Sequence, residues 1–223
     1  MPTEPCAAIW DVDGTLVDTA ELHFAAWERT AREMGRPFSR EDFAATFGRR
    51  NPEIIRFLFR REFADSEVLD IGDRKETYYR SAAEAGVRLL PGVRELLDEL
   101  HARGVRQAVG SSAPRGNLDL ILRITNSRQY FDAIVGMEDT HRGKPDPEVF
   151  LVAARKLGVP PGRCVVFEDA VAGVEAAKAG GMKCVAVTFV GHHPEEKLKE
   201  AGADWVIHSF AEITADDVLA LVR

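Results

Sequence analysis

The chain has 223 residues, enough for one sizeable domain and a smaller inserted one, and its 45% hydrophobic and 29% charged content is ordinary for a folded protein. Its 36 acidic residues outnumber the 29 basic ones, so the basic excess typical of nucleic-acid binding is missing. We expect a cytoplasmic protein that binds neither nucleic acid nor membrane, because no run of about 20 apolar residues and no signal peptide is present.

The first predicted element is a short buried strand at residues 6–12 (CAAIWDV). Residues 19–86 differ from the rest of the chain, because they carry helical patterns and no convincing strand. Asn51-Pro52 is typical of a helix cap followed by proline at the first helical position. A longer helix is predicted from about Ser66 to Ala85. One face of the first predicted helix carries Leu22, Ala26, Trp27, Thr30 and Met34.

From about residue 87 onward, predicted strands and helices alternate. The strand segments are apolar without a polar–apolar alternation, as is typical of strands buried on both faces. We therefore predict an α/β fold with a parallel sheet covered by helices on both sides, interrupted by an all-helical insertion. The predicted strands are 105–110, 131–135, 164–167, 182–188 and 205–207, and the predicted helices are 93–103, 114–124, 147–158, 170–181, 195–201 and a last helix after residue 207.

Polar side chains follow several of the predicted strands. In an open parallel sheet, ligands bind beyond the carboxyl ends of the strands, so these side chains are candidate site residues. Lys144, in the sequence GKPDP, lies just before a predicted helix. The strand ends carry Asp11, Asp13 and Thr15 after the first strand, Ser111 and Ser112 after the second, and Glu168 and Asp169 after a later one.

Four carboxylates in one crevice would repel one another strongly. At an effective dielectric constant near 20, two unit charges about 4 Å apart cost on the order of 4 kcal/mol. Protonation of one carboxylate or binding of a hard divalent cation relieves this repulsion, and oxygen ligands suit Mg²⁺. Lys144, Ser111 and Thr15 supply the cation and hydroxyl donors that a phosphoryl group requires. The combination favours phosphoryl transfer.

Asp11 and Asp13 are two residues apart, so on an extended segment both side chains face the same side. One carboxylate can attack phosphorus while the other handles the proton of the leaving group. We interpret Asp11 as the nucleophile that forms an aspartyl-phosphate, and Asp13 as the acid and base. Gly14 allows the sharp turn that directs backbone N–H groups toward the phosphate.

The string DVDGTLVD at residues 11–18 resembles the first motif of the haloacid dehalogenase superfamily. Ser111, Lys144-Pro145 and Glu168-Asp169 are similar to its second, third and fourth motifs, in the same order. The resemblance implies a Rossmann-like, three-layer core of residues 1–17 and 88–223, with a helical cap of residues 18–87 inserted after the first strand. It also implies that Mg²⁺ is held by Asp11, the backbone carbonyl of Asp13, and Asp169 with Glu168 beside them, and that Ser111 and Lys144 hold the phosphoryl oxygens.

Residues 11–27 resemble the β-phosphoglucomutase-like branch of this superfamily, including His23 and Trp27 of the cap. Two differences affect the binding of a second phosphate. Ala113-Pro114-Arg115 replaces the polar run of the mutases, and the segment GRRNPE offers Arg49 and Arg50 one or two places before the mutase arginine. The resemblance thus implies a phosphatase that acts on a sugar phosphate or a similar small metabolite, with a mutase as the alternative. The candidate substrate contacts are Thr15, His23, Arg49 and Ser112.

Other interpretations of these residues stay open. His23 could be an ordinary histidine, Trp27 a core residue and Arg49 a solvated one, and Glu168 could bind the metal directly or through water. The adjacent His192 and His193 are interpreted as part of a solvated loop. A non-enzymatic phosphate-binding or regulatory protein on the same fold is a further alternative, whereas Asp13 argues against dehalogenation. A monomer is expected.

Overall fold

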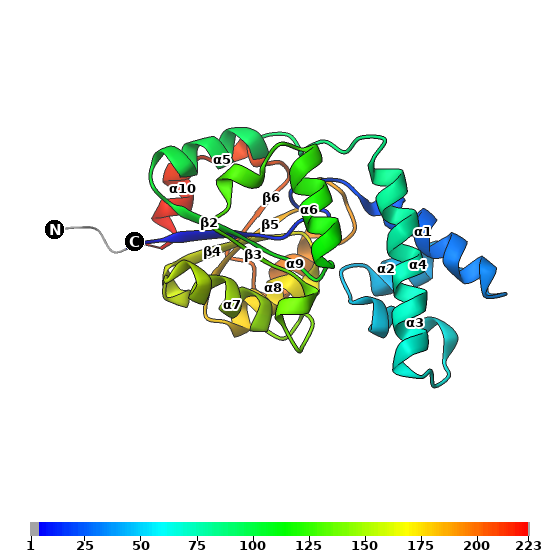
Figure 1. Ribbon diagram of the computed structural model, residues 1–223. Coiled ribbons are helices and arrows are strands. Elements are labelled where there is room, and N and C mark those ends of the chain that lie inside the picture. Colours follow the sequence, from blue (N-terminus) through cyan, green and yellow to red (C-terminus); the bar gives the residue numbers. More distant parts are fainter. Residues whose placement is uncertain (1–4, 223) are drawn as a thin grey trace.

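The structure is a computed structural model that describes residues 5–222. Its centre is a six-stranded sheet with the strand order β3-β2-β1-β4-β5-β6, in which all neighbouring strands are parallel (Figure 1). The predicted α/β fold is confirmed. The strands are β1 (Ala7–Trp10), β2 (Arg106–Gly110), β3 (Ala133–Val135), β4 (Cys164–Glu168), β5 (Lys183–Val187) and β6 (Trp205–Ile207).

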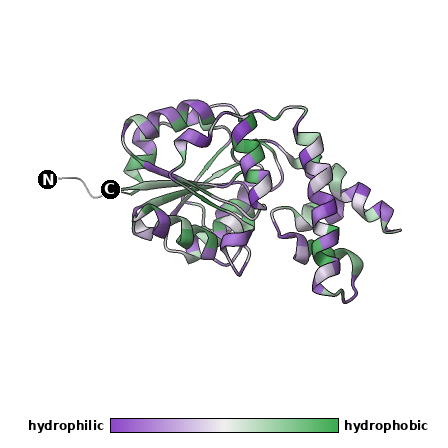
Figure 2. Ribbon diagram, viewed as in Figure 1, coloured by the Kyte–Doolittle hydropathy of each residue, from purple (hydrophilic) through white to green (hydrophobic). Residues whose placement is uncertain are grey.

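The central strand β1 explains why the strand segments lack a polar–apolar alternation. Ala8 and Trp10 belong to the hydrophobic cluster on one face of the sheet, whereas Ala7 and Ile9 belong to the cluster on the other face. All four side chains are buried, so both faces of the strand require apolar residues. Figure 2 shows this as hydrophobic strands between helices whose outer sides are hydrophilic.

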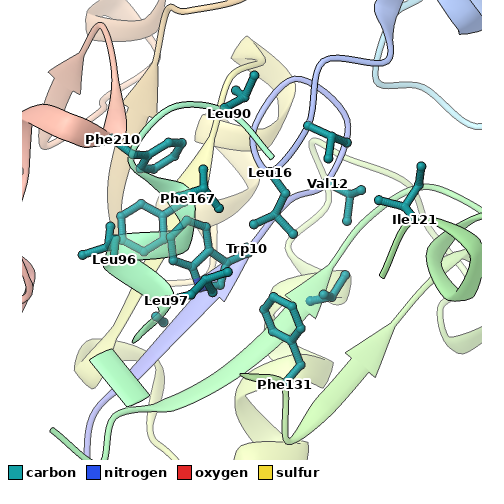
Figure 3. Packing of buried hydrophobic residues seen from close by; sticks show 14 of the residues in the cluster. Trp10, Val12, Leu16, Leu90, Leu96, Leu97, Ile121, Phe131, Phe167 and Phe210 are labelled. Atoms are coloured by element: carbon teal, nitrogen blue, oxygen red, sulfur yellow. The ribbon is translucent and has the colours of Figure 1, made fainter. Parts of the chain in front are cut away.

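Two helical layers cover the sheet. The first layer packs on Trp10, which stacks against Phe167 at 4.1 Å between ring centroids (Figure 3). The indole Nε1 of Trp10 donates a hydrogen bond to Gln107 Oε1, so the polar atom of this large buried ring is satisfied. The first layer contains α5 (Val93–Ala102), α6 (Arg115–Ile124) and α10 (Ala215–Ala220), and the second contains α7 (Glu148–Leu157), α8 (Val171–Ala179) and α9 (Glu195–Glu200).

The four helices between β1 and α5 form a separate cap beside the core (Figure 1). The cap has its own hydrophobic cluster, which includes Trp27 and Ile55. Its two connections to the core run side by side, because Leu90 N–H donates to Leu16 C=O and Val17 bridges to Leu89. The helices are α1 (Ala20–Glu33), α2 (Arg40–Thr46), α3 (Asn51–Phe59) and α4 (Asp65–Ala83).

A helical cap inserted after the first strand is therefore present, while its predicted limits at residues 18 and 87 stay a prediction. Residues 1–4 and 223 of the predicted core lie outside the described residues. Within the described residues, no helix is long and apolar enough to cross a lipid bilayer.

Two details of the cap differ from the sequence analysis. Asn51 is the first residue of α3 rather than its cap, because Arg50 occupies the extended position before the helix. The side chain of Asn51 is instead directed to Glu76, to which its Nδ2 donates at 2.8 Å. The short helix α2 was not predicted, although Ser39 and Asp42 form a capping box at its start.

Candidate active site

A pocket lies between the carboxyl ends of the central strands and the cap. Of the ten predicted site residues, all but Thr15 line it. Thr15 is fully buried, and its hydroxyl has no hydrogen-bond partner among the described residues. The predicted site residues that line the pocket are Asp11, Asp13, Ser111, Ser112, Lys144, Glu168 and Asp169 from the core and His23 and Arg49 from the cap.

Gly14 allows the loop after β1 to approach the loop after β4. Its φ of +89° lies in the left-handed region, and a Cβ at this position would lie 2.1 Å from Asp169 Oδ2. A side chain would therefore collide with a predicted metal ligand. The sequence analysis expected a sharp turn at Gly14, and the structure adds this close approach.

Three carboxylates meet at the core side of the pocket. Ligand atoms of Asp11, Glu168 and Asp169 lie within 4.8 Å of one another, and all three residues are buried. Lys144 Nζ donates to Asp11 Oδ1 at 2.6 Å and to Glu168 Oε1 at 2.5 Å. One lysine thus faces three carboxylates in a place with little water, so an excess of negative charge remains.

This charge excess changes the protonation of the cluster. Burial raises the pKa of the Asp11 carboxyl to about 7, against the opposing effect of Lys144. Burial also raises the pKa of Asp169, and the charge of Glu168 adds to this rise. Burial alone would lower the pKa of Lys144, but Asp11 and Glu168 outweigh burial and raise it. Lys144 therefore stays charged, while Asp11 and Asp169 lose their protons only at a higher pH than usual.

The free ligand atoms of the cluster fit a hard cation. Asp169 Oδ2 is buried without a hydrogen-bond partner among the described residues, so it is available as a ligand. Glu168 is more occupied, since its Oε2 accepts from the backbone N–H groups of Asp169 and Ala170 and its Oε1 from Lys144. The donor set consists of oxygen atoms only, which is the set that Mg²⁺ prefers.

Asp13 lies apart from this cluster and is held by the cap. Its Oδ1 accepts hydrogen bonds from Thr19 Oγ1 at 2.5 Å and from Tyr79 Oη at 3.3 Å, and it contacts His23 Nε2 at 3.1 Å. Burial alone would raise its pKa, but the contacts with His23 and Thr19 outweigh burial and lower the pKa to about 2. Asp13 is therefore ionised at neutral pH in this arrangement.

A chain of hydrogen bonds links Asp13 to the cap helix α4. Lys75 Nζ lies 2.8 Å from His23 Nδ1. Because a lysine ammonium has only donors, Nδ1 accepts this bond, so Nε2 carries the ring hydrogen and donates to Asp13. The predicted site residue His23 thus joins Lys75 to the candidate acid and base.

Lys75 and Tyr79 were not predicted as site residues. The signal that could have found Lys75 is its position in the helical pattern of α4, where it falls between apolar and aromatic residues four places before and after it. Lys75 is 2% exposed, so a charged residue occupies a buried position and requires a polar partner. The buried residues of α4 are Val68, Ile71, Gly72, Lys75, Glu76, Tyr79 and Ala83.

Arg49 and Arg50 are neighbours with different surroundings. Arg49 is exposed and lines the pocket. Arg50 Nη1 donates to Thr140 C=O at 3.2 Å and its Nη2 to Arg142 C=O at 2.6 Å. Because residues 140–143 lead into Lys144, Arg50 ties the cap to the loop that carries this lysine.

Two further residues of the sequence analysis lie where the cap meets the core. Trp27 is 2% exposed and belongs to the cap cluster, and it also lines the pocket. His192 does not lie in a solvated loop as predicted. Its ring is half-buried and lies 4.3 Å from the ring of Phe47, since this loop of the core packs against the cap. His193 is also half-buried.

Residues 8–187 of the chain match the family of haloacid dehalogenase-like hydrolases. The chain belongs to this family. The phosphorylated carbohydrates phosphatase of Thermotoga maritima is 33% identical to this hydrolase over 204 residues, which cover 88% of the hydrolase and 91% of the relative. The β-phosphoglucomutase of Bacillus subtilis is 32% identical over 217 residues, which cover 94% and 92%.

A solved structure leads to the same family branch. The crystal structure of CbbY from Rhodobacter sphaeroides in complex with phosphate matches this hydrolase with a TM-score of 0.82 and 32% identity. The match covers 92% of the hydrolase and 95% of CbbY. The predicted superfamily and its β-phosphoglucomutase-like branch are confirmed.

Proposed function

We propose that this haloacid dehalogenase-like hydrolase is a magnesium-dependent phosphatase that hydrolyses a small phosphomonoester, and that the substrate is a sugar phosphate. The observation that carries the proposal is the placement of Asp11. Its carboxylate accepts a hydrogen bond from Lys144 and lies within 4.8 Å of ligand atoms of Glu168 and Asp169, while Asp13 lines the same pocket. A nucleophile, a cation and a second carboxylate thus surround one space in which a phosphoryl group fits.

Because Asp13 is ionised without substrate, it first takes up a proton when the phosphomonoester binds, since the negative charge of the phosphate raises its pKa. In the first step, a carboxylate oxygen of Asp11 then attacks phosphorus, and the bond from phosphorus to the leaving oxygen breaks. Asp13 donates its proton to that oxygen, so the leaving group departs as a neutral alcohol. The product is an aspartyl-phosphate on Asp11.

In the second step, water attacks the phosphorus of the aspartyl-phosphate. Asp13 accepts a proton from this water, and the bond between phosphorus and Asp11 breaks to release inorganic phosphate. Asp13 can take this proton because it lost its own in the first step, and its contacts with His23 and Thr19 hold the ionised carboxylate in place.

The remaining residues hold the phosphoryl group and the metal. Bound Mg²⁺ supplies positive charge that offsets the repulsion between the acids and the phosphate. We assign it to Asp11, the carbonyl of Asp13, and Asp169, whose Oδ2 accepts no hydrogen bond from the described residues. Glu168 holds Lys144 in place, and Lys144 and Ser111 bind phosphoryl oxygens. His23, Arg49 and Ser112, which line the pocket, stay the proposed substrate contacts, whereas the side chain of Thr15 is fully buried and does not line it.

The relative from Thermotoga maritima supports a phosphorylated carbohydrate as substrate, because the phosphatase aligns with 88% of this chain. The Bacillus subtilis relative supports the second candidate, a β-phosphoglucomutase. In that reaction a sugar hydroxyl takes the place of water in the second step. Incubation with β-glucose 1-phosphate and a trace of the 1,6-bisphosphate separates the two, since free phosphate indicates hydrolysis and glucose 6-phosphate indicates the mutase.

The decisive experiment is a panel of phosphorylated metabolites assayed for release of inorganic phosphate. We expect release from one or more sugar phosphates with Mg²⁺, loss of release with a chelator, and recovery when Mg²⁺ is restored in excess. Turnover that persists in the chelator would contradict the role of the acidic cluster. Absence of release from every phosphomonoester would contradict the phosphatase.

A further inference from the structure

The cap side of the pocket contains a buried carboxylate that the proposed reaction does not use. Glu76 lines the pocket from α4 and is only 3% exposed. Its Oε1 accepts hydrogen bonds from Lys75 Nζ at 2.9 Å and from Asn51 Nδ2 at 2.8 Å. Its Oε2 accepts from Asn117 Nδ2 at 2.6 Å. Residues of two cap helices and of the core helix α6 thus hold this carboxylate in one orientation.

The charge of Glu76 determines how strongly the cap side of the pocket, here called the cap wall, attracts an anion. Lys75 forms an ion pair with Glu76, and a lysine paired in this way offers little attraction to a second anion. Burial alone would raise the pKa of Glu76, but the charge of Lys75 and the hydrogen bonds from Asn117 and Asn51 outweigh burial and lower it, so the carboxylate is ionised. Arg49 also lines the pocket, but it is exposed, and water screens its charge.

The hydrogen-bonding capacity of this wall favours donors on the ligand. A carboxylate can accept about four hydrogen bonds, and Glu76 accepts three from the described residues. Asn51 also lines the pocket, and its Oδ1 accepts no bond from a described side chain. Sugar hydroxyls can donate to both acceptors, whereas a phosphate dianion has only acceptors to offer.

The rest of the cap wall is apolar. Trp27, Phe43 and Ile54 line the pocket and are almost fully buried. Aromatic and aliphatic side chains next to fixed polar acceptors form a surface that suits the C–H groups and the hydroxyl groups of a polyol at once.

We infer that Glu76 makes the pocket selective for a phosphomonoester whose leaving group is a neutral polyol, and that it rejects substrates that carry a second phosphate. The inference rests on the proposed phosphatase activity and adds the class of its leaving group. It also disfavours a mutase cycle, because that cycle passes through a bisphosphorylated sugar. Selection follows from a fixed, buried negative charge in the wall of the pocket, which disfavours an additional phosphate there.

The test compares matched substrates that differ by one phosphate. The kcat/KM for phosphate release is measured with fructose 1-phosphate, fructose 6-phosphate and fructose 1,6-bisphosphate, in excess Mg²⁺. For the wild-type protein we expect the better monophosphate to exceed the bisphosphate by about tenfold or more. The ratio of the two values is the readout, so any general effect on the chemical step cancels.

Glu76→Gln keeps the shape of the side chain and removes its charge. We expect this variant to reduce the ratio about tenfold, mainly through a lower KM for the bisphosphate. The matched control is Asp70→Asn, which removes one negative charge from an exposed position of the same helix and should leave the ratio unchanged. Asn51→Lys, which adds a positive charge next to Glu76, should reduce the ratio as well and covers the case in which Glu76→Gln does not fold.

The outcomes separate this inference from the proposed function. A wild-type protein that hydrolyses the bisphosphate as well as the monophosphates is a phosphatase without the proposed selection. An unchanged ratio in Glu76→Gln, or an equal change in Asp70→Asn, would also overturn the role of Glu76 while the phosphatase stands. Failure to release phosphate from any of the three substrates or from the wider panel would overturn the phosphatase itself.

Discussion

The core side and the cap side of the pocket both contain buried charges, but they balance them differently. On the core side, Lys144 faces the carboxylates of Asp11, Glu168 and Asp169. On the cap side, Lys75 and Glu76 form a pair that two asparagines complete. An unbalanced cluster requires a cation or a substrate, whereas a balanced pair is stable by itself. The difference indicates chemistry on the core side and selection on the cap side.

The largest effect is expected from a change on the core side. Asp11→Asn removes the proposed nucleophile and leaves its shape, so we expect kcat to fall by about 10⁴-fold or more on every substrate, as for the loss of other covalent nucleophiles. Phosphate release under saturating substrate measures this loss. Circular dichroism of the variant provides the control for folding. Residual activity within tenfold of the wild type would show that another group attacks phosphorus.

A smaller effect is expected on the free energy of unfolding of the metal-free protein. Its sign should differ between the core-side acid Asp11 and the cap-side acid Glu76. The pKa of Asp11 is raised from 3.8 to about 7, so its ionisation destabilises the folded state as pH rises from about 4 to above 7. Since a difference of one in pKa corresponds to about 1.4 kcal/mol, the full cost is about 4 kcal/mol. Asp11→Asn should therefore raise the free energy of unfolding of the metal-free protein at pH 8.

The cap carboxylate should behave in the opposite way. The pKa of Glu76 is lowered because the charge of Lys75 and the hydrogen bonds from Asn117 and Asn51 outweigh burial, so its ionised form stabilises the fold above its unfolded pKa. Glu76→Gln should lower the free energy of unfolding at pH 8, because it removes the ion pair with Lys75. Urea unfolding in a chelator at pH 5 and pH 8 measures both variants. Two variants that shift stability in the same direction at pH 8 would contradict the contrast between the two sides.

The same contrast explains what could be predicted from the sequence. The core residues follow strands whose order and direction fix their positions, so Asp11, Ser111 and Glu168 could be assigned to one edge of a parallel sheet. The loops there are short, and Gly14, which has no side chain, allows Asp169 to lie directly against it. The sequence motifs therefore largely determine where these core residues lie.

The cap residues depend on how helices pack and dock, which local patterns do not determine. The apolar face of α4 can be read from the sequence, yet nothing in it tells that Lys75 on this face reaches His23. From the sequence we predict Arg49 rather than Arg50 as a substrate contact, but local patterns do not determine which of the two faces the pocket. A shift of the loop by one residue would exchange their directions. Only the docked cap directs one to the pocket and the other to Thr140.

The smallest effect is expected from the link between the two sides. Arg50 holds the backbone carbonyls of Thr140 and Arg142 and should favour the closed cap. Hydrogen bonds from a charged group contribute about 1.5–3 kcal/mol when buried, and Arg50 is only half-buried, so we expect Arg50→Gln to raise KM by about tenfold with kcat changed less than threefold. Arg56→Gln removes the same charge from an exposed position of α3 and should leave both constants unchanged. A fall in kcat at constant KM would instead mean that Arg50 positions the loop of Lys144 during the chemical step.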